Sequence, residues 1–163
     1  MRLPADATLI VIGTQFARES AAGAAANVAR LIDAWRAEAL PIVHVRAGSQ
    51  TEFAGGGNPE PVIETASPGA FAASKLELLL EEIGATTLTL CGDAGAVEAT
   101  AREAADLGYQ AFVVADACLD LEGRAPSFAR LRKPVATLVD ASEALRAAAF
   151  AKARQRHQAQ RSK

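Results

Sequence analysis

The segment Thr8–Gln15 constrains the fold more than any other part of the sequence. It is a run of apolar residues, β-branched from Ile10 to Ile12, and it closes with Gly13 and two polar residues. A continuous apolar run without polar alternation is typical of a strand buried on both faces, at the centre of a parallel sheet. The ligand crevice of such a sheet lies beyond the carboxyl ends of its strands, so position 13 is where a functional group is first expected. The residue at this position, glycine, has no functional group in its side chain.

Four stretches have the pattern of a helix. The first, from Ser20 to about Glu38, repeats apolar residues at intervals of three and four, which places them on one stripe. The stripe comprises Val28, Leu31, Ile32 and Trp35. The second is expected to start with a capping box at Ser74–Glu77 and to end at Gly84. Its stripe comprises Leu76, Leu79, Leu80 and Ile83. The third is predicted from an N-cap at Asp93 to Leu107, with Gly108 closing it, and the last starts at the cap Asp140–Glu143.

Strands alternate with these helices. Besides the first strand, the predicted strands are Ile42–Val45, Pro61–Glu64, Thr87–Cys91, Gln110–Ala115 and Val135–Val139. Residues 46–60, 65–70 and 116–133 are predicted to be mostly loop, with a short helix at 127–130. This alternation predicts an α/β fold, a doubly wound (Rossmann-like) six-stranded parallel sheet with helices on both faces. At 163 residues, one domain over 1–163 is expected, with residues 152–163 as a polar, frayed tail.

Composition narrows the function classes. The formal net charge of −2 argues against a nucleic-acid surface and against a polybasic membrane anchor. The sequence has neither an apolar signal core at its start nor a run of about 18 apolar residues, so a cytoplasmic protein is expected. Two cysteines, Cys91 and Cys118, do not make a disulfide framework.

Several short motifs, in a specific order along the chain, carry a family resemblance. They are Leu9–Gln15, Leu31–Arg36, Pro41–Arg46, Pro61–Glu64, Ala70–Phe71, Ala99–Tyr109 and Val113–Cys118. With these motifs, nearly the whole chain resembles the isochorismatase-like cysteine hydrolases, a family that includes nicotinamidases and related amidases. The resemblance implies the same fold, hydrolysis of small amide or ether-type substrates, and assembly into oligomers.

The resemblance also implies an aspartate, a lysine and a nucleophilic cysteine, and this chain has none of the three at the matching positions. The aspartate's position directly after the first strand is Gly13, and the lysine's position is Thr65. The cysteine's position is Ala96 when counted back from Thr100, or Glu98 when counted forward from Gly92, because the segment is about two residues short. The missing residues fall in the turn that would supply the oxyanion hole, where losing one donor typically costs about 2.7–4 kcal/mol.

A metal site is not expected either. Nicotinamidase-type members hold a metal with Asp and His residues after the second strand, where this chain reads Arg46–Gln50. The two histidines, His44 and His157, lie far apart in the sequence and without a nearby carboxylate cluster. We therefore expect no metal and no cofactor.

Other residues near the expected crevice are candidate pocket-lining groups. They are Gln15, Glu19, His44, Thr65, Cys91, Gly92, Asp93 and Glu98. Structural roles compete with this interpretation. Cysteine suits a buried apolar position, and carboxylates are stabilised in the first turn of a helix by about 0.3–1 kcal/mol. His44, between two valines of a strand, is expected in the core rather than as a base.

Three functional hypotheses remain open. The first is a pseudoenzyme that keeps the fold and acts as a small-ligand binder, or as a partner in a homo-oligomer or beside an active paralogue. The second is an active amidase or hydrolase with relocated groups around Cys91, Asp93 and Glu98. The third is a pure scaffold subunit whose crevice is filled by side chains. No nucleic-acid or membrane partner is expected.

Overall fold

A parallel sheet forms the centre of the fold. In the computed structural model, which describes residues 7–12, 22–47, 61–65, 71, 75–119 and 136–149, six strands have the order β3-β2-β1-β4-β5-β6. They are β1 (Thr8–Ile12), β2 (Ile42–Ala47), β3 (Val62–Thr65), β4 (Thr87–Asp93), β5 (Gln110–Leu119) and β6 (Thr137–Val139). Each adjacent pair is parallel, and β1 lies between β2 and β4 with all five of its residues buried. This central position explains why the β1 sequence is apolar throughout.

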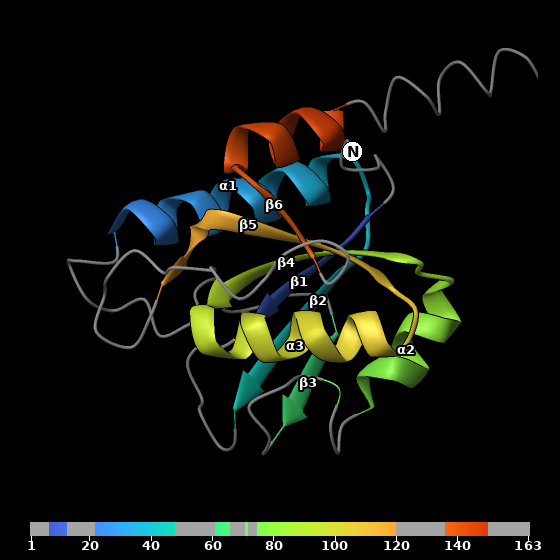
Figure 1. Cartoon of the computed structure of the whole chain (residues 1–163). Coiled ribbons are helices and arrows are strands. Elements are labelled where there is room, and N and C mark those ends of the chain that lie inside the picture. The colour runs from blue at the N-terminus through green and yellow to red at the C-terminus, as the bar shows by residue number, and fades with distance from the viewer. Residues whose placement is uncertain are drawn as a thin grey trace, which may run out of the picture.

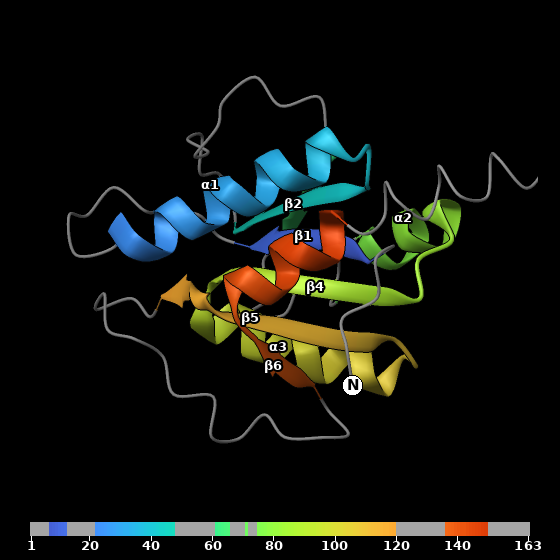
Figure 2. The ribbon, with the colours of Figure 1, turned by 90° about the horizontal axis from the view of Figure 1, so that it is seen from above.

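Helices cover both faces of the sheet, as the sequence predicted. They are α1 (Ala22–Ala37), α2 (Leu76–Ile83), α3 (Ala94–Asp106) and a helix over residues 141–149. Figure 1 shows α1 and helix 141–149 above the sheet and α2 and α3 below it, and Figure 2 shows the same arrangement from above. The α/β fold class is thereby confirmed. Among the described residues, no helix is long and apolar enough to cross a membrane.

Two apolar clusters, one on each face, form the core. The α1 face comprises Leu9, Val11, Cys91, Phe112 and Val114 from the strands together with the buried residues of α1 and helix 141–149. The α3 face comprises Ile10, Ile12, Leu88, Leu90 and Val113 from the strands together with buried residues of α2 and α3. Because alternate residues of a strand point to opposite faces, β1, β2, β4 and β5 each contribute to both clusters.

Helix α1 buries the stripe that its sequence predicts. Val28, Leu31, Ile32 and Trp35 are all buried, whereas Arg30, Asp33 and Arg36 are exposed. The indole Nε1 of Trp35 donates a hydrogen bond to the carbonyl oxygen of Ala7, at 2.8 Å. This bond satisfies the polar atom of a large buried side chain and joins α1 to the residue that precedes β1.

Helix α2 differs from its prediction at its start. Its N-cap is Lys75, whose side chain makes no capping hydrogen bond, so the expected capping box is wrong; Ser74 lies outside the described residues. Gly84 ends the helix in a left-handed conformation, as expected. Leu76 and Leu80 are buried, but Ile83 is 37% exposed, because the helix ends there at the edge of the core. Leu79 is partly buried against the core.

Strands β4 and β5 are longer than predicted. The sequence predicts that β4 ends at Cys91 and that a loop begins at Asp116, but the two strands pair again at Gly92 with Cys118 and at Asp93 with Leu119. The preceding pair is Leu90 with Val113. Four residues of β5, 114–117, therefore lie opposite a single residue of β4, Cys91. Such a bulge lets a strand continue after extra residues are inserted into it. A pattern of apolar residues does not reveal a bulge of this kind.

The other predicted boundaries lie within a few residues of the observed ones, as is usual for helix and strand ends. Strand β2 extends to Ala47, β3 ends at Thr65, and β6 starts at Thr137. Several predictions lie outside the described residues. These are the start of the first helix at 20–21, the loops at 48–60 and 66–70, the short helix at 127–130 and the tail at 152–163.

Thr89 on β4 provides a test of core packing. Its Oγ1 is buried and has no hydrogen-bond partner among the described residues. A buried hydroxyl without a partner typically costs about 1–3 kcal/mol, so we expect Thr89→Val to raise the free energy of unfolding by about 1 kcal/mol. Urea denaturation would measure the change.

Thr100 on α3 is the matched control for this substitution. It is also fully buried, but its Oγ1 donates to the carbonyl oxygen of Ala96, at 2.6 Å. Thr100→Val should therefore lower the free energy of unfolding by about 1 kcal/mol. An equal fall in the free energy of unfolding in both variants would contradict the conclusion that the Thr89 hydroxyl has no hydrogen-bond partner among the described residues.

Candidate functional site

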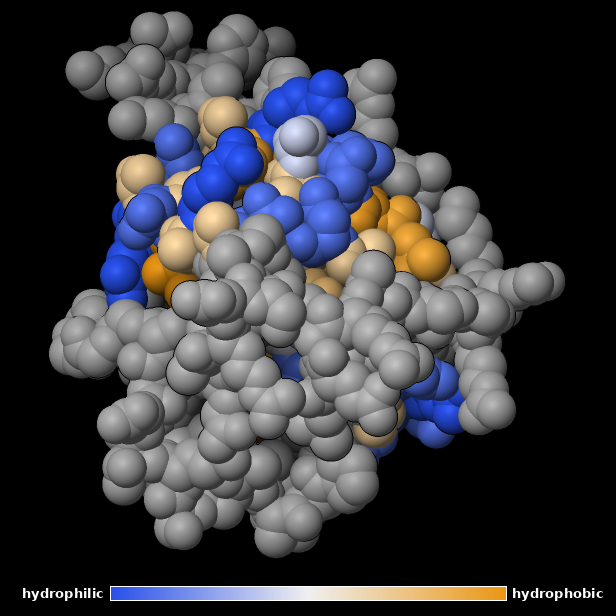
Figure 3. Space-filling model, turned by 90° about the vertical axis from the view of Figure 1, so that its left-hand side faces the viewer, coloured by the Kyte–Doolittle hydropathy of each residue, from blue (hydrophilic) through white to orange (hydrophobic). Residues whose placement is uncertain are grey.

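The carboxyl ends of the strands meet at one edge of the sheet, which is the left side of Figure 1. Thr65 is the last residue of β3, where it pairs with Ala47, and Ala96 lies in the first turn of α3 directly after β4. Gly13 follows β1 in the sequence but lies outside the described residues. Figure 3 looks onto this edge, and hydrophilic side chains predominate in the described upper part of the view, where α1 and helix 141–149 lie. Gln15 and Glu19 also lie outside the described residues.

Strand β4 passes directly into α3, without a loop. Asp93 is the last residue of the strand and also the N-cap of the helix, which begins at Ala94. Gly92 has a φ of +118°, and a Cβ atom on it would overlap the carbonyl oxygen of Ile12. Only glycine combines this backbone conformation with so close an approach of β4 to β1. Gly92 therefore allows the backbone of β4 to lie against that of β1 just before the candidate site.

Asp93 occupies the amino end of α3. Its Oδ1 accepts hydrogen bonds from the backbone N–H groups of Gly95, at 3.0 Å, and Ala96, at 3.3 Å. The N-cap predicted from the sequence is thus confirmed. The free N–H groups and the dipole at a helix start form a site for an anion. Here that site already holds a carboxylate of the chain itself.

Replacing Asp93 with alanine tests this capping role. The change removes the acceptor of two N–H groups, so we expect the free energy of unfolding to fall by about 0.5–2 kcal/mol. Asp93→Asn keeps an oxygen acceptor, so its free energy of unfolding should fall by less than that of Asp93→Ala. Urea denaturation of the three proteins would measure both effects.

The matched control is Glu98→Ala, one turn further along α3. Glu98 forms an i,i+4 ion pair with Arg102, at 2.8 Å, in which the Arg102 side chain is 49% exposed. Exposed pairs of this kind contribute only about 0.3–0.5 kcal/mol. A loss at Glu98 as large as that at Asp93 would contradict the special role of the cap.

The Glu98–Arg102 pair also bears on chemistry. The Glu98 carboxylate accepts a hydrogen bond from the guanidinium of Arg102 and is held along the side of α3. Ala96, the other position at which the resemblance would place the nucleophile, ends in a methyl group. Of the two positions, Ala96 is the one in the first helical turn.

The two thiols are buried. Cys91 is fully buried on the α1 face of the sheet, and its Sγ lies 3.9 Å from the carbonyl oxygen of Ile10. Burial raises the pKa of Cys91 well above its ordinary value, and the nearby Cys118 adds to this shift. Helix α3 packs on the opposite face, so the structure does not bring the Cys91 thiol together with Ala96.

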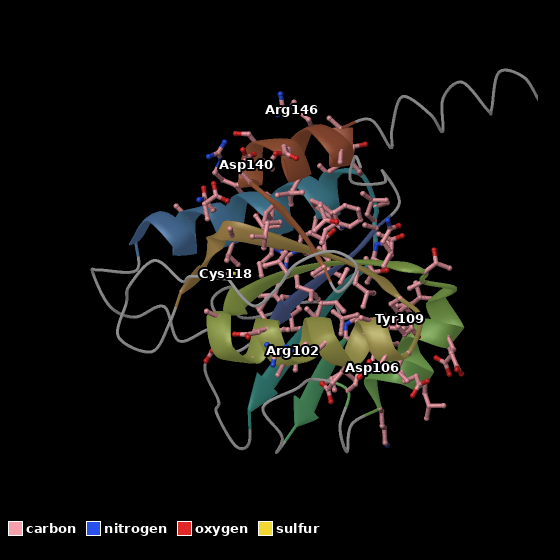
Figure 4. The ribbon with its side chains drawn as sticks, viewed as in Figure 1. Arg102, Asp106, Tyr109, Cys118, Asp140 and Arg146 are labelled. Carbon is pink, nitrogen blue, oxygen red and sulfur yellow. The ribbon has the colours of Figure 1, made fainter. Side chains whose placement is uncertain are left out.

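Cys118 lies at the end of β5, as Figure 4 shows, where its Sγ donates to the carbonyl oxygen of Val114, at 3.2 Å. This bond spans the bulge. Burial raises the pKa of Cys118 to about 12; a hydrogen bond from the backbone of Gly92 opposes the shift, and the carboxylates of Asp116 and Asp93 add to it. A thiol with so high a pKa holds its proton at neutral pH.

His44 is buried in β2 and lies apart from the start of α3. Val43 and Val45 belong to the α3 face of the sheet, so the alternation of the strand directs His44 to the α1 face. Within the described part of the chain, no group of three or more His, Cys, Asp or Glu side chains is arranged to hold a metal ion.

Asp116 is a structural residue that the sequence analysis missed. It lies in the bulge of β5, where its Oδ1 accepts a hydrogen bond from the backbone N–H of Ala141, at 2.8 Å. Its carbonyl oxygen accepts a bond from the side chain of Asn27 on α1, at 2.7 Å. Asp116 thereby joins β5 to both helices of the α1 face. Its position in the motif Val113–Cys118 was the one available signal.

Comparison with known families now identifies the fold. The family model described as the Isochorismatase domain matches residues 9–143, which is most of the chain. The chain belongs to the isochorismatase family. The match includes all of β1 except its first residue, the other five strands and the first residues of helix 141–149, so it covers the whole candidate site.

Solved structures of isochorismatase relatives agree with this assignment. An isochorismatase from Pseudomonas putida has a TM-score of 0.73 and 28% identity, with 87% of this chain and 92% of that chain covered. An isochorismatase family protein from Burkholderia thailandensis has a TM-score of 0.74 and 22% identity, covering 90% and 97%. N-carbamoylsarcosine amidase from Thermoplasma acidophilum has a TM-score of 0.65 and 19% identity, covering 86% and 97%. The two relatives below 25% identity establish similarity of fold only.

Motifs shared with the family have structural roles in this chain. Phe71 stacks on Tyr109, with ring centroids 5.7 Å apart, and the backbone N–H of Phe71 donates to the Glu103 carboxylate, at 3.3 Å. Trp35 and Asp116 hold α1 and helix 141–149 to the sheet, as described above. These motifs therefore contribute packing contacts and hydrogen bonds to the fold.

Proposed function

We propose that this isochorismatase-family protein is a catalytically inactive member of its family, which serves as a small-ligand binder or as an oligomer partner, either in a homo-oligomer or beside an active relative. One observation carries the proposal. The N–H groups of Gly95 and Ala96, at the helix start where an oxyanion would need donors, bond to the carboxylate of Asp93. A developing negative charge would meet an anion there instead of free donors.

The other positions support the same conclusion. An alanine methyl group, a threonine and a glycine stand at the positions that the resemblance assigns to the cysteine, the lysine and the aspartate: Ala96, Thr65 and Gly13. The alternative, an active hydrolase with relocated groups, would need a thiolate near Asp93 and Glu98. Cys91 is buried on the other face of the sheet with a raised pKa, and Glu98 is paired with Arg102.

Hydrolysis assays test the proposal directly. We expect no turnover of nicotinamide, an N-carbamoyl amino acid or a small enol ether above the rate in buffer, and the same result for Cys91→Ala. Clear turnover by the unmodified chain that disappears in Cys91→Ala would overturn the proposal and support the relocated-group hypothesis.

Thermal unfolding separates the remaining roles. A ligand that binds only the folded state adds stability, about 2.7 kcal/mol at a concentration of 100 times its Kd. A rise of the melting temperature with one of the same compounds, without turnover, would support a ligand binder. Co-purification of a catalytically active relative from the native cytoplasm would instead support the partner role.

A further inference from the structure

We draw no further inference here: the strongest candidate, the outer edge of strand β6 with the exposed side chain of Leu138, carries none, because nothing in the described part of the chain shows what covers it.

Discussion

Replacing Gly92 with alanine is expected to leave the protein unable to fold stably. The new Cβ would overlap the carbonyl oxygen of Ile12 and lie 2.9 Å from its carbonyl carbon. Both are backbone atoms of β1, the central strand, so they cannot move without breaking the pairing of Ile12 with Gly92. The φ of +118° adds strain that a side chain does not tolerate.

The expected loss exceeds about 4 kcal/mol, which is a large part of the total stability of a typical domain. The measurement is the circular dichroism and urea denaturation of the purified variant. Gly84→Ala is the matched control, because Gly84 has a φ of +80° but nothing within 4 Å of the added Cβ. It should cost only about 1 kcal/mol. A Gly92→Ala protein as stable as this control would show that β4 and β1 do not approach each other as described.

The second large effect concerns the thiols, which we expect to be almost inert in the folded protein. With a pKa of about 12, Cys118 has about a thousandfold less thiolate at pH 8 than an ordinary cysteine. Cys91 is fully buried and its pKa is also raised. Alkylation by iodoacetamide should therefore be slow in native buffer, and both thiols should react promptly in urea. A thiol that reacts faster than free cysteine at neutral pH would revive the relocated-nucleophile hypothesis.

The same pKa predicts how stability changes with pH. Between about pH 8.5 and 12 the folded state keeps the Cys118 proton while the unfolded state loses it, so the free energy of unfolding falls as the pH rises. Each such thiol contributes a slope of about 1.4 kcal/mol per pH unit in this range and nothing below it. Cys118→Ala should flatten the slope between pH 9 and 10.5 by that amount. Equal slopes of the free energy of unfolding against pH in the unmodified protein and in Cys118→Ala would contradict the raised pKa of Cys118.

Much of the fold could be predicted because local patterns and packing agree. The apolar run of β1, the stripe around Trp35 and the cap at Asp93 each belong to a single element. The bulge of β5 could not be found in this way, since Asp116 interrupts the apolar run and is typical of the start of a loop. The arrangement of residues 114–117 depends on the pairing of Cys118 with Gly92 on another strand.

The contacts of the candidate site could be predicted only in part. The residues at positions 13, 65 and 96 are visible in the sequence. The Asp93 carboxylate accepts a hydrogen bond from the N–H of Ala96 because β4 passes directly into α3. This direct passage is visible only in the structure. The start of α2 was mispredicted because Ser74 and Glu77 satisfy a pattern, whereas the helix begins one residue later, after Lys75.

The junction between β4 and α3 also has a consequence for protein engineering. A cysteine in place of Ala96 would put a thiol where the backbone N–H already donates a hydrogen bond to Asp93. The close contact of Gly92 with Ile12 prevents the backbone from shifting there. Point substitutions alone would preserve that geometry. Under the proposed function, a designer who wants a nucleophile at position 96 should therefore lengthen the backbone between Gly92 and Ala96 first, and only then choose side chains.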